Sequence, residues 1–485
     1  MESIRLGRRP LANTRRAAWT LRSSPPAPAI LRPMDGRLVL KNCSVFCPDG
    51  RVRSAMAVLI EGGKISKVAP DDEIPILPGD WEVACEGRVV APGLVDCHAH
   101  LVGGQLVPLS GQFLLKPRRQ RFEALQDMES RLVPAEVEAL TAFAIASALR
   151  SGVTMTVEHL HCPSDAAGGL AAQARTAERL GMRFVNSHAT HSGFGAGSAM
   201  EQLEANAAQA VERKNHPLVR CALGFHASFA CDDALLSRLG RLRVELGVGV
   251  HGHVAESEDD VAITSSRFGQ RIVPRLEAQG LLGSGCVAAH ATAIDQLDSQ
   301  RLAKTATVVA LSPLRNLIEE PTGASWEFLA PDEGLISLGT AGSTLLREEI
   351  ASAFASMVQW ARLGRGRDPD ALISAFLLHT PAKFCTGIFG EPSGKVAPGN
   401  QAELVVYDLV PFAEGPVGLG GLLLQIVRSP VAWTIVAGRV VVREGRLLAH
   451  DFRELAKDAQ GALQSIGSRA GAMSASASKS VPPLP

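Results

Sequence analysis

The stretch VVAPGLVDCHAH, residues 89–100, decides the fold because a buried strand runs directly into polar side chains. Its apolar residues form the near-continuous run that is typical of a strand covered on both faces. His98 and His100 end this run. Residues two apart on a strand point to the same side, so both imidazoles can face one metal ion.

Seven further apolar runs follow, and helical patterns lie between most of them. One helical pattern begins at Pro134 and stops at Gly152, as an N1 proline and a C-terminal glycine should. Eight buried strands alternating with crossovers predict an α/β fold, a (β/α)8 TIM barrel over residues 91–393. A doubly wound open sheet is the alternative, and the count of eight and the positions of the polar residues favour the barrel. The seven runs are VTMTVEHL (153–160), RFVNSHAT (183–190), VRCALGFHAS (219–228), VGVHGHVAE (248–256), CVAAHAT (286–292), TVVALSP (307–313) and GLISLGTAG (334–342).

Both ends of the chain carry short strands with tight turns. One set lies in residues 34–90, and a second lies in 394–450, where Ala437 and Glu444, each followed by glycine, fit hairpin turns. Each set alone has too few strands to be stable. We therefore expect both segments to form one small composite β-sandwich domain.

The two tails lack this patterning. Residues 1–33 carry seven arginines and one acid, followed by a proline-rich run. A transit peptide is one interpretation. We favour the other, an upstream extension before a start at Met34, because the stretch has little helical amphipathicity. Residues 451–485 are expected to hold a C-terminal helix and then a disordered, low-complexity tail.

Composition indicates which classes of binding partner the protein is expected to have. Lys plus Arg and Asp plus Glu both number 49, so the formal net charge is zero and does not favour nucleic acid. No apolar run reaches the roughly 18 residues that a membrane span needs. We expect a small-molecule substrate and no nucleic-acid or membrane partner, and we leave a homo-oligomer open. The nine cysteines lack paired zinc spacing and indicate buried residues in a reducing cytoplasm.

Polar side chains gather at the C-terminal ends of the predicted strands, where barrel enzymes place their sites. For a single histidine, a core or surface residue with a satisfied hydrogen bond is the commoner explanation. That explanation is weaker for this set of histidines, because at least six of the 13 end strands of one predicted barrel. Besides the first pair, the candidates are Glu158 and His159 after the second strand, His226 after the fourth, His253 and Glu256 at the fifth, His290 after the sixth and Asn316 after the seventh.

These segments carry a resemblance that runs from about residue 38 to residue 448. PGLVDCHAHL resembles the amidohydrolase superfamily signature around its first metal-binding histidine pair. HGHVAES is similar to the His-x-x-Glu element of the branch with guanine deaminase, chlorohydrolases and related aminohydrolases. VAAHA, GFHASFACDDALLSRL and PGNQAELVVYDL resemble further segments of that branch. Each element is a moderate signal alone, and their order and spacing make a strong one.

The resemblance implies a role for each matching residue. One divalent metal ion, zinc or iron, would be held by His98, His100 and His253. Glu256 would move a proton between the attacking water and the substrate nitrogen, and His290 would hold that water or polarise the substrate. The substrate contacts would be His226 and Asn316. This chemistry is consistent, since a divalent metal lowers the pKa of water from about 16 to about 7 and the leaving nitrogen needs a proton.

One metal ligand of the family is missing. Its last barrel strand ends with an aspartate in a Gly-Thr-Asp-Gly-like run, whereas this run reads LGTAGS and places Ala341 there. Alanine can neither coordinate a metal nor accept a proton. Either the ion is held weakly by three histidines and water, or Glu158 or His159 completes its shell.

The sequence thus predicts an enzyme, a metal-dependent hydrolase acting on a non-peptide carbon–nitrogen bond. Hydrolytic deamination of an amino-heterocycle or a related small molecule is the expected reaction. The alternative is a non-catalytic relative that keeps the fold as a binding or assembly module. The retained histidines and Glu256 favour the enzyme, because a dead site has no physical need for so many convergent imidazoles.

Overall fold

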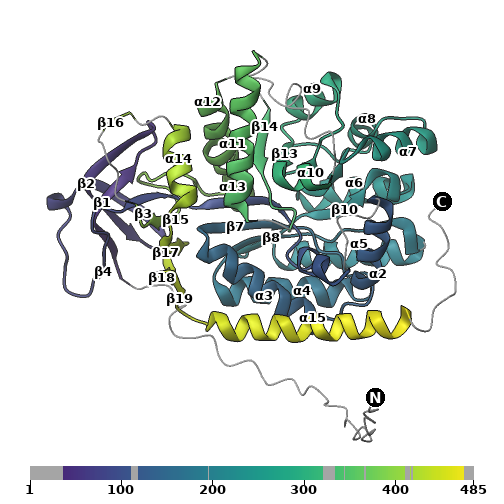
Figure 1. Ribbon diagram of the computed structural model, residues 1–485, viewed down its shortest axis with the longest axis horizontal. Coiled ribbons are helices and arrows are strands. Elements are labelled where there is room, and N and C mark those ends of the chain that lie inside the picture. The colour runs from purple at the N-terminus through teal and green to yellow at the C-terminus, as the bar shows by residue number, and fades with distance from the viewer. Residues whose placement is uncertain are drawn as a thin grey trace, which may run out of the picture.

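The computed structural model describes residues 36–110, 118–194, 196–319, 334–342, 345–364, 368–409, 415–416 and 419–474. These residues form a barrel of alternating strands and helices with a β-sheet beside it (Figure 1). The predicted tail 1–33, the start at Met34 and the tail after residue 474 lie outside the described residues.

The predicted (β/α)8 barrel is confirmed, with all eight strand positions where the apolar runs place them. The fourth position is split at Ala222 into β9 (Val219–Cys221) and β10 (Leu223–Ala227). The end of the eighth strand meets the first, where Ala341 N donates to His98 O over 3.0 Å. The strands of the two parallel sheets, β6 to β9 and β10 to β14, are β6 (Leu94–Ala99), β7 (Val153–Glu158), β8 (Arg183–Asn186), β9, β10, β11 (Val250–Val254), β12 (Val287–His290), β13 (Val308–Leu311) and β14 (Leu335–Leu338).

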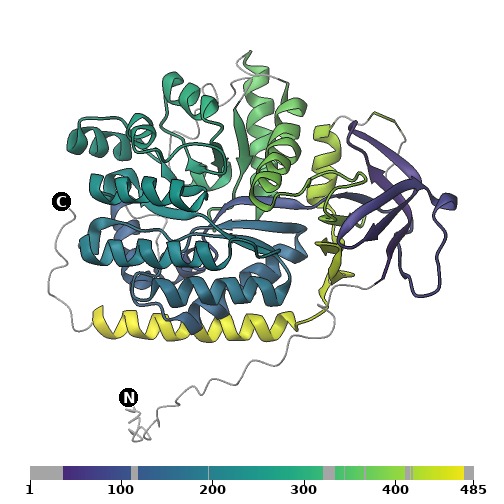
Figure 2. The same ribbon diagram turned by 180° about the vertical axis from the view of Figure 1, so that it is seen from behind.

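Helices connect these strands and cover the outside of the barrel (Figures 1 and 2). α3 (Pro134–Arg150) begins at the predicted proline. Asp165 and Asp232 cap the first turns of α4 (Ala166–Leu180) and α6 (Asp233–Leu246), because each carboxylate accepts a backbone N–H three residues on. The other helices are α1 (Gly103–Leu106), α2 (Arg118–Glu129), α5 (Ala196–Glu212), α7 (Glu258–Phe268), α8 (Ile272–Ala278), α9 (Gln296–Lys304), α10 (Pro313–Glu319), α11 (Leu346–Arg362), α12 (Pro369–Ser374), α13 (Thr380–Phe389) and α14 (Leu419–Arg428).

One helical run differs from the expectation that no segment is long and apolar enough to span a membrane. α12, a π-helical turn and α13 form a continuous run, Pro369–Phe389, of 21 residues that meets the length and hydropathy of a span. Ile373, Phe376 and Leu377 of this run are buried in the barrel's hydrophobic core. The core helix of a globular protein meets the same criteria, so the run is weak evidence for a span.

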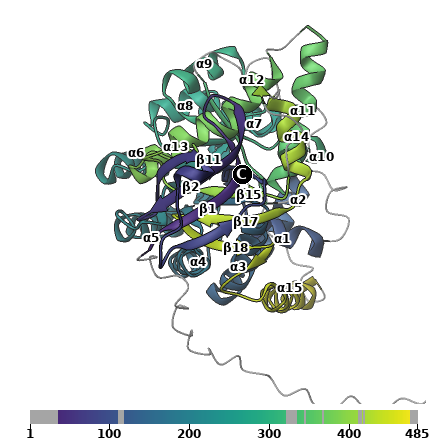
Figure 3. The ribbon, with the colours of Figure 1, turned by 90° about the vertical axis from the view of Figure 1, so that its left-hand side faces the viewer.

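Strands from both ends of the chain pair in a single ten-stranded sheet (Figure 3). The central pairing is antiparallel, with Val90 of β5 opposite Val406 of β15. Ala437 and Glu444 have φ of 49° and 45° and precede left-handed glycines, as the predicted hairpin turns require. The strands are β1 (Leu38–Phe46), β2 (Arg51–Glu61), β3 (Lys64–Pro70), β4 (Trp81–Ala84), β5 (Val89–Pro92), β15 (Leu404–Tyr407), β16 (Gly415–Pro416), β17 (Val431–Val436), β18 (Arg439–Arg443) and β19 (Arg446–Leu447).

The chain then crosses back to the barrel as a long helix, α15 (Phe452–Ser474), which lies along α3 (Figures 1 and 2). Its buried residues Ala459, Ala462 and Ile466 share a hydrophobic cluster with Val137 and Leu140 of α3. The C-terminal helix is therefore an integral part of the barrel's outer layer.

Candidate active site

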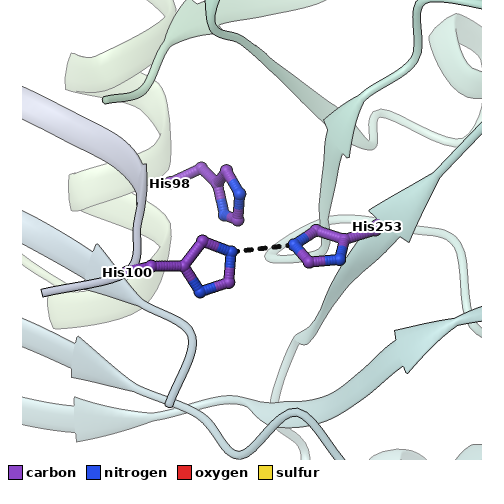
Figure 4. Close-up of side chains that lie close together, drawn as sticks. All are labelled: His98, His100 and His253. Atoms are coloured by element: carbon purple, nitrogen blue, oxygen red, sulfur yellow. Dashed lines mark hydrogen bonds between the residues drawn. The ribbon is translucent and has the colours of Figure 1, made fainter. Parts of the chain in front are cut away.

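Three histidines meet at the C-terminal end of the barrel strands. His98 lies in β6, His100 directly follows it, and His253 lies in β11. One ring nitrogen from each falls within 4.8 Å of the other two, and Figure 4 shows the rings of His100 and His253 edge to edge with His98 beside them. In the part of the chain that the structure describes, this is the group of side chains suited to holding a metal ion. We call it the histidine trio.

A chain of hydrogen bonds fixes the protonation of His98. Ser187 Oγ donates to Glu158 O over 2.7 Å, so it accepts from His251 Nδ1, 3.1 Å away. His251 Nε2 must then accept from His98 Nδ1, at 2.9 Å. This leaves a lone pair on His98 Nε2, which is buried without a hydrogen-bond partner. An orphaned, outward lone pair of this kind is what a metal ligand presents.

The other two histidines of the trio are oriented in the same way. His100 Nδ1 donates to the carbonyl of His159 over 2.8 Å, which leaves a lone pair on His100 Nε2. That atom lies 3.0 Å from His253 Nε2. His253 Nδ1 in turn lies 3.1 Å from Nδ1 of His226 and can donate to it, which leaves the proton of His226 on Nε2.

The trio therefore fits a cation. Two nitrogen lone pairs 3.0 Å apart repel each other unless a proton or a metal ion lies between them. An additional proton is disfavoured, because burial first and the positive charge of Arg315 second lower the pKa of His100 to about 3. Neutral His253 carries its own proton on Nδ1 when it donates to His226, so that proton does not lie between the two nitrogens. Burial likewise lowers the pKa of His98 and of His253 well below the ordinary value. Neutral imidazoles with converging lone pairs are the ligand set that zinc and iron accept.

Glu256 and His290 stand beside the trio. Glu256 Oε1 lies 3.8 Å from His290 Nε2, and both side chains line the same cavity as His100 and His253. Ala255, His290 and Ala291 have φ of 48°, 71° and 49°, left-handed values that side chains other than glycine rarely adopt. Such strain is concentrated at functional sites, and here it lies at the C-terminal ends of β11 and β12.

The end of the eighth strand presses against the first. Thr340 donates to Asp96 through its backbone N–H and its hydroxyl, over 3.0 and 2.8 Å. A side chain at Gly339 or Gly342 would collide with the backbone of His98 or His100. Ala341 lies between these glycines, is 1% exposed and lines the cavity. The position that lacks the family's aspartate is thus adjacent to the trio.

The two alternative ligands from the second strand have different surroundings. The Glu158 carboxylate accepts Leu101 N at 2.9 Å and Gln173 Nε2 at 2.9 Å. It supports the backbone beneath the trio and is not among the groups suited to a metal. His159 donates from Nε2 to Phe225 O over 3.1 Å, and its buried Nδ1 has no partner. Its ring centroid lies 5.4 Å from that of His100.

Asn316, the expected substrate contact after the seventh strand, lies next to a cavity-lining arginine that the sequence analysis did not name. Asn316 is buried in α10, does not line the cavity and has an amide nitrogen without a partner. Arg315 lines the cavity, and its Nη1 lies 3.3 Å from Ala341 O. The single residue between strand and helix turns the arginine inward, which spacing alone does not reveal.

Further side chains lie near the trio: His161, which follows the second barrel strand, and Phe122, Glu129 and His191, which sequence reasoning did not name. Phe122 stacks on His226, with ring centroids 4.8 Å apart and planes 19° apart. His161 lies 2.9 Å from Glu129 and 3.1 Å from His191. The HGH spacing was the available signal for His251, because it places a second histidine one pleat below His253 on the same face.

Comparison with known proteins shows which family the chain resembles. The Amidohydrolase family matches residues 89–441. A 5'-deoxyadenosine deaminase of Methanopyrus kandleri is 28% identical over 439 residues, which cover 86% of this chain and 96% of that protein. A 5-methylthioadenosine/S-adenosylhomocysteine deaminase of Syntrophobacter fumaroxidans is 27% identical over 432 residues, covering 84% and 93%.

Solved structures share the fold. A zinc-bound adenosine deaminase of Xanthomonas campestris superposes with a TM-score of 0.76 at 22% identity, over 89% of this chain and 98% of that one. Atrazine chlorohydrolase of Arthrobacter aurescens, also complexed with zinc, gives 0.75 at 16% identity, over 88% and 100%. Identity this low establishes the fold alone. The family match covers most of the chain and includes all three histidines of the trio, so the chain belongs to the amidohydrolase family.

Proposed function

We propose that the protein is a metal-dependent hydrolase that removes an amino group from a small amino-heterocycle. The observation that carries the proposal is the histidine trio, in which three neutral imidazoles present lone pairs to one point beside Glu256. The relatives named above are deaminases of adenosine-type compounds, which supports a purine-like ring as the substrate. They are all enzymes, so the non-catalytic alternative gains no support from them.

We infer that one zinc ion occupies the trio. Its chemistry, when bound, is to make hydroxide available near neutral pH. Within the chain, Glu256 takes a proton from the attacking water and delivers it to the leaving nitrogen. His290 orients the water, since its Nε2 faces Glu256 at 3.8 Å. His226, with its proton on Nε2, donates to an acceptor on the substrate ring. We propose that Asn316 contacts the substrate only when α10 moves, because its side chain does not line the cavity.

Two accounts of the absent aspartate remain open. In the first, His98, His100 and His253 hold the ion weakly and water fills the remaining position. In the second, His159 or Glu158 joins the shell. The partners of Glu158, Leu101 N and Gln173, favour the first account, whereas the orphaned Nδ1 of His159 supports the second.

We place the enzyme in the cytoplasm, because all nine cysteines are buried and unpaired, as in a reducing compartment. We expect a small-molecule substrate in the cavity beside the trio, because the relatives named above act on small molecules.

The test combines metal analysis with an ammonia-release screen. Purified full-length protein is analysed for zinc and iron and then incubated with adenosine derivatives, purines, pterins, triazines and hydantoins. We expect metal in the wild type, ammonia from at least one class, and loss of ammonia release but not of metal in Glu256→Gln. Glu258→Gln, a change in the first turn of α7, is the matched control. Protein that holds no metal even after zinc addition and releases no ammonia contradicts the proposal.

A further inference from the structure

A second cavity, of about 520 Å³, lies at the opposite mouth of the barrel from the histidine trio. Two glycines that line it, Gly249 and Gly285, come just before β11 and β12, so the cavity lies at the N-terminal ends of these strands. Gly249 is four residues before His253, which corresponds to roughly 13 Å along a strand. This basal cavity, as we call it, is therefore separate from the candidate active site.

Basic side chains make up the charged lining of the basal cavity. They are Arg220 of β9, Arg243 of α6 and Lys214, which follows α5. No acidic residue is among the lining residues, all of which lie in 196–319 and 368–409, ranges that the structure describes. Within the described residues, none of the three basic side chains forms an ion pair with a carboxylate. The cavity therefore gathers three positive charges.

The acidic side chains that are closest to them in sequence are engaged with other cations. Glu212 Oε1 lies 3.1 Å from Nη2 of Arg213, and Glu245 Oε2 lies 3.7 Å from Nη1 of Arg238. Both carboxylates are also more than half exposed, so water screens what remains of their charge. They do not neutralise the basal cavity.

Two of the three basic side chains are held in place. Arg220 donates from Nη1 to the backbone carbonyls of Arg213 and Lys214. Its guanidinium also lies over the ring of Phe389, 5.5 Å from the centroid. Arg243 donates from Nη1 to a backbone carbonyl at 3.2 Å, and its Nε is buried with no hydrogen-bond partner among the described residues. Both guanidinium groups are thus fixed at the cavity before any ligand arrives.

Helix ends offset part of the positive charge. Ala210, Leu246 and Ile388, from the last turns of α5, α6 and α13, line the cavity. The C-terminal end of a helix carries about half a unit of negative charge, so three ends supply roughly 1.5 units. The three basic side chains exceed this, and a surplus of more than one positive charge remains. Such a surplus suits a phosphate monoester, which carries about 1.5 to 2 negative charges at pH 7.

The cavity also offers room and apolar surface for an organic group. Its volume lies within the range of about 300–1,000 Å³ that is usual for small-molecule sites. Leu246, Val248 and Ile388 provide apolar walls. Val244 lines it too and is 76% exposed, so an organic group there would cover apolar surface that now faces water. A bare phosphate ion would use little of this surface.

We propose that the basal cavity binds a small phosphate monoester, as a ligand site distinct from the histidine trio. The two guanidinium groups receive the phosphate oxygens through paired, charge-assisted hydrogen bonds, and Lys214 adds a mobile ammonium group. The organic part of the ester rests on Leu246, Val248 and Ile388. The ester takes no part in the hydrolysis proposed above, because the trio lies at the other end of the strands.

Matched substitutions at Gly387 test the site. Gly387 lines the cavity, and a Cβ atom added there meets no atom within 4 Å. Gly387→Glu therefore brings a negative charge to the cavity without removing a native contact, and Gly387→Gln is the uncharged control of the same size. Arg220→Gln removes one of the proposed phosphate contacts, and Arg241→Gln, on the exposed face of α6, is its control. Zinc content and melting temperature are measured for every variant.

Calorimetry of the full-length protein with phenyl phosphate, phenol and inorganic phosphate gives the readout. We expect phenyl phosphate to bind the wild type about 10- to 100-fold more tightly than phenol, as charge-assisted pairing implies. Gly387→Gln and Arg241→Gln should keep this preference, whereas Gly387→Glu and Arg220→Gln should lose most of it. Inorganic phosphate should bind more weakly than the ester, because it lacks the group that covers the apolar walls.

Three results would overturn the proposal. The first is equal affinity of the wild type for phenyl phosphate and phenol. The second is a preference that persists in both Gly387→Glu and Arg220→Gln, which would place the phosphate elsewhere, such as at the metal. The third is inorganic phosphate binding as tightly as the ester, which would reduce the cavity to a simple ion site. Absence of ammonia release with the preference intact contradicts the proposed function alone.

Discussion

At the scale of single residues, we expect position 341 to decide how strongly a metal is held. Ala341 has φ of 45°, a left-handed value that aspartate tolerates better than alanine. Ala341→Asp therefore costs little backbone strain and adds a carboxylate beside the trio. We expect metal affinity to rise about 10- to 100-fold. Metal content after dialysis against a weak chelator measures the change.

The same assay distinguishes the two explanations of how a metal ion is held without an aspartate at position 341. If three histidines and water hold the ion, His159→Ala changes its retention little. If His159 or Glu158 completes the shell, His159→Ala or Glu158→Ala strips the metal and Ala341→Asp adds nothing. Failure of every variant to retain metal would argue against both accounts.

Glu158 gives the fold a dependence on pH. Burial, ahead of the opposing hydrogen bonds, raises its pKa from 4.5 to about 8. Between these values the folded state holds a proton that the unfolded state has released. The stability that this proton provides is therefore present in acid and is lost as pH rises through about 8. Glu158→Gln, which cannot ionise, should flatten this decline.

Urea unfolding of metal-free protein at a series of pH values between 4.5 and 9 measures the effect. Glu138→Gln, on the surface of α3, is the matched control. A wild type and a Glu158→Gln variant with the same slope of stability against pH would show that Glu158 ionises normally in the fold.

At the scale of elements, the barrel strands could be read from the sequence because a parallel strand is apolar throughout and ends abruptly in polar residues. The arginine that sequence reasoning did not name lies where local geometry changes. Arg315 and Asn316 sit in the first turn of α10, and a rotation of about 100° per residue decides which faces inward. The Phe122–His226 stack joins residues 104 apart, a contact that no local pattern encodes. The domain boundaries and the roles of the site residues stay predictions.

The two ends of the chain should differ in their effect on stability. Deleting residues 1–33 is expected to leave folding and activity unchanged, because no core-facing periodicity is visible there. Deleting residues 452–485 removes α15 and exposes Val137 and Leu140, so the melting temperature should fall by several degrees. Thermal unfolding of both truncations compares them directly. A large drop after the first deletion, or none after the second, contradicts the prediction.

At the scale of the whole molecule, one ion pair ties the barrel to the composite sheet. Arg183 of β8 donates from Nε to Glu403 Oε1 over 2.5 Å, with both side chains less than a tenth exposed. Glu403 also accepts Ala437 N, from the hairpin after β17, at 2.9 Å. The two bodies are therefore joined through buried polar contacts.

Breaking this pair should destabilise the whole chain. Glu403→Gln leaves the Arg183 charge buried without its counter-ion, which costs about 3–5 kcal/mol of the free energy of unfolding. Arg183→Met combined with Glu403→Met removes both charges and should recover much of the loss. Urea unfolding followed by fluorescence and by circular dichroism checks this. A loss under 1 kcal/mol for Glu403→Gln (about the value of an exposed pair) would show that the pair is effectively solvated.

The pairing of β5 with β15 also means that the composite sheet cannot be completed until late in translation. About 300 residues of barrel must be translated between these strands, which takes roughly 15–60 s at about 5–20 residues per second. For that interval β5 can pair with β1 on one edge, but the edge that later pairs with β15 is open. An open, apolar strand edge is a template for aggregation. We therefore expect the nascent chain to depend on a chaperone, or on a low rate of synthesis, until β15 emerges. Production at low temperature or with holding chaperones should therefore raise the yield of folded protein.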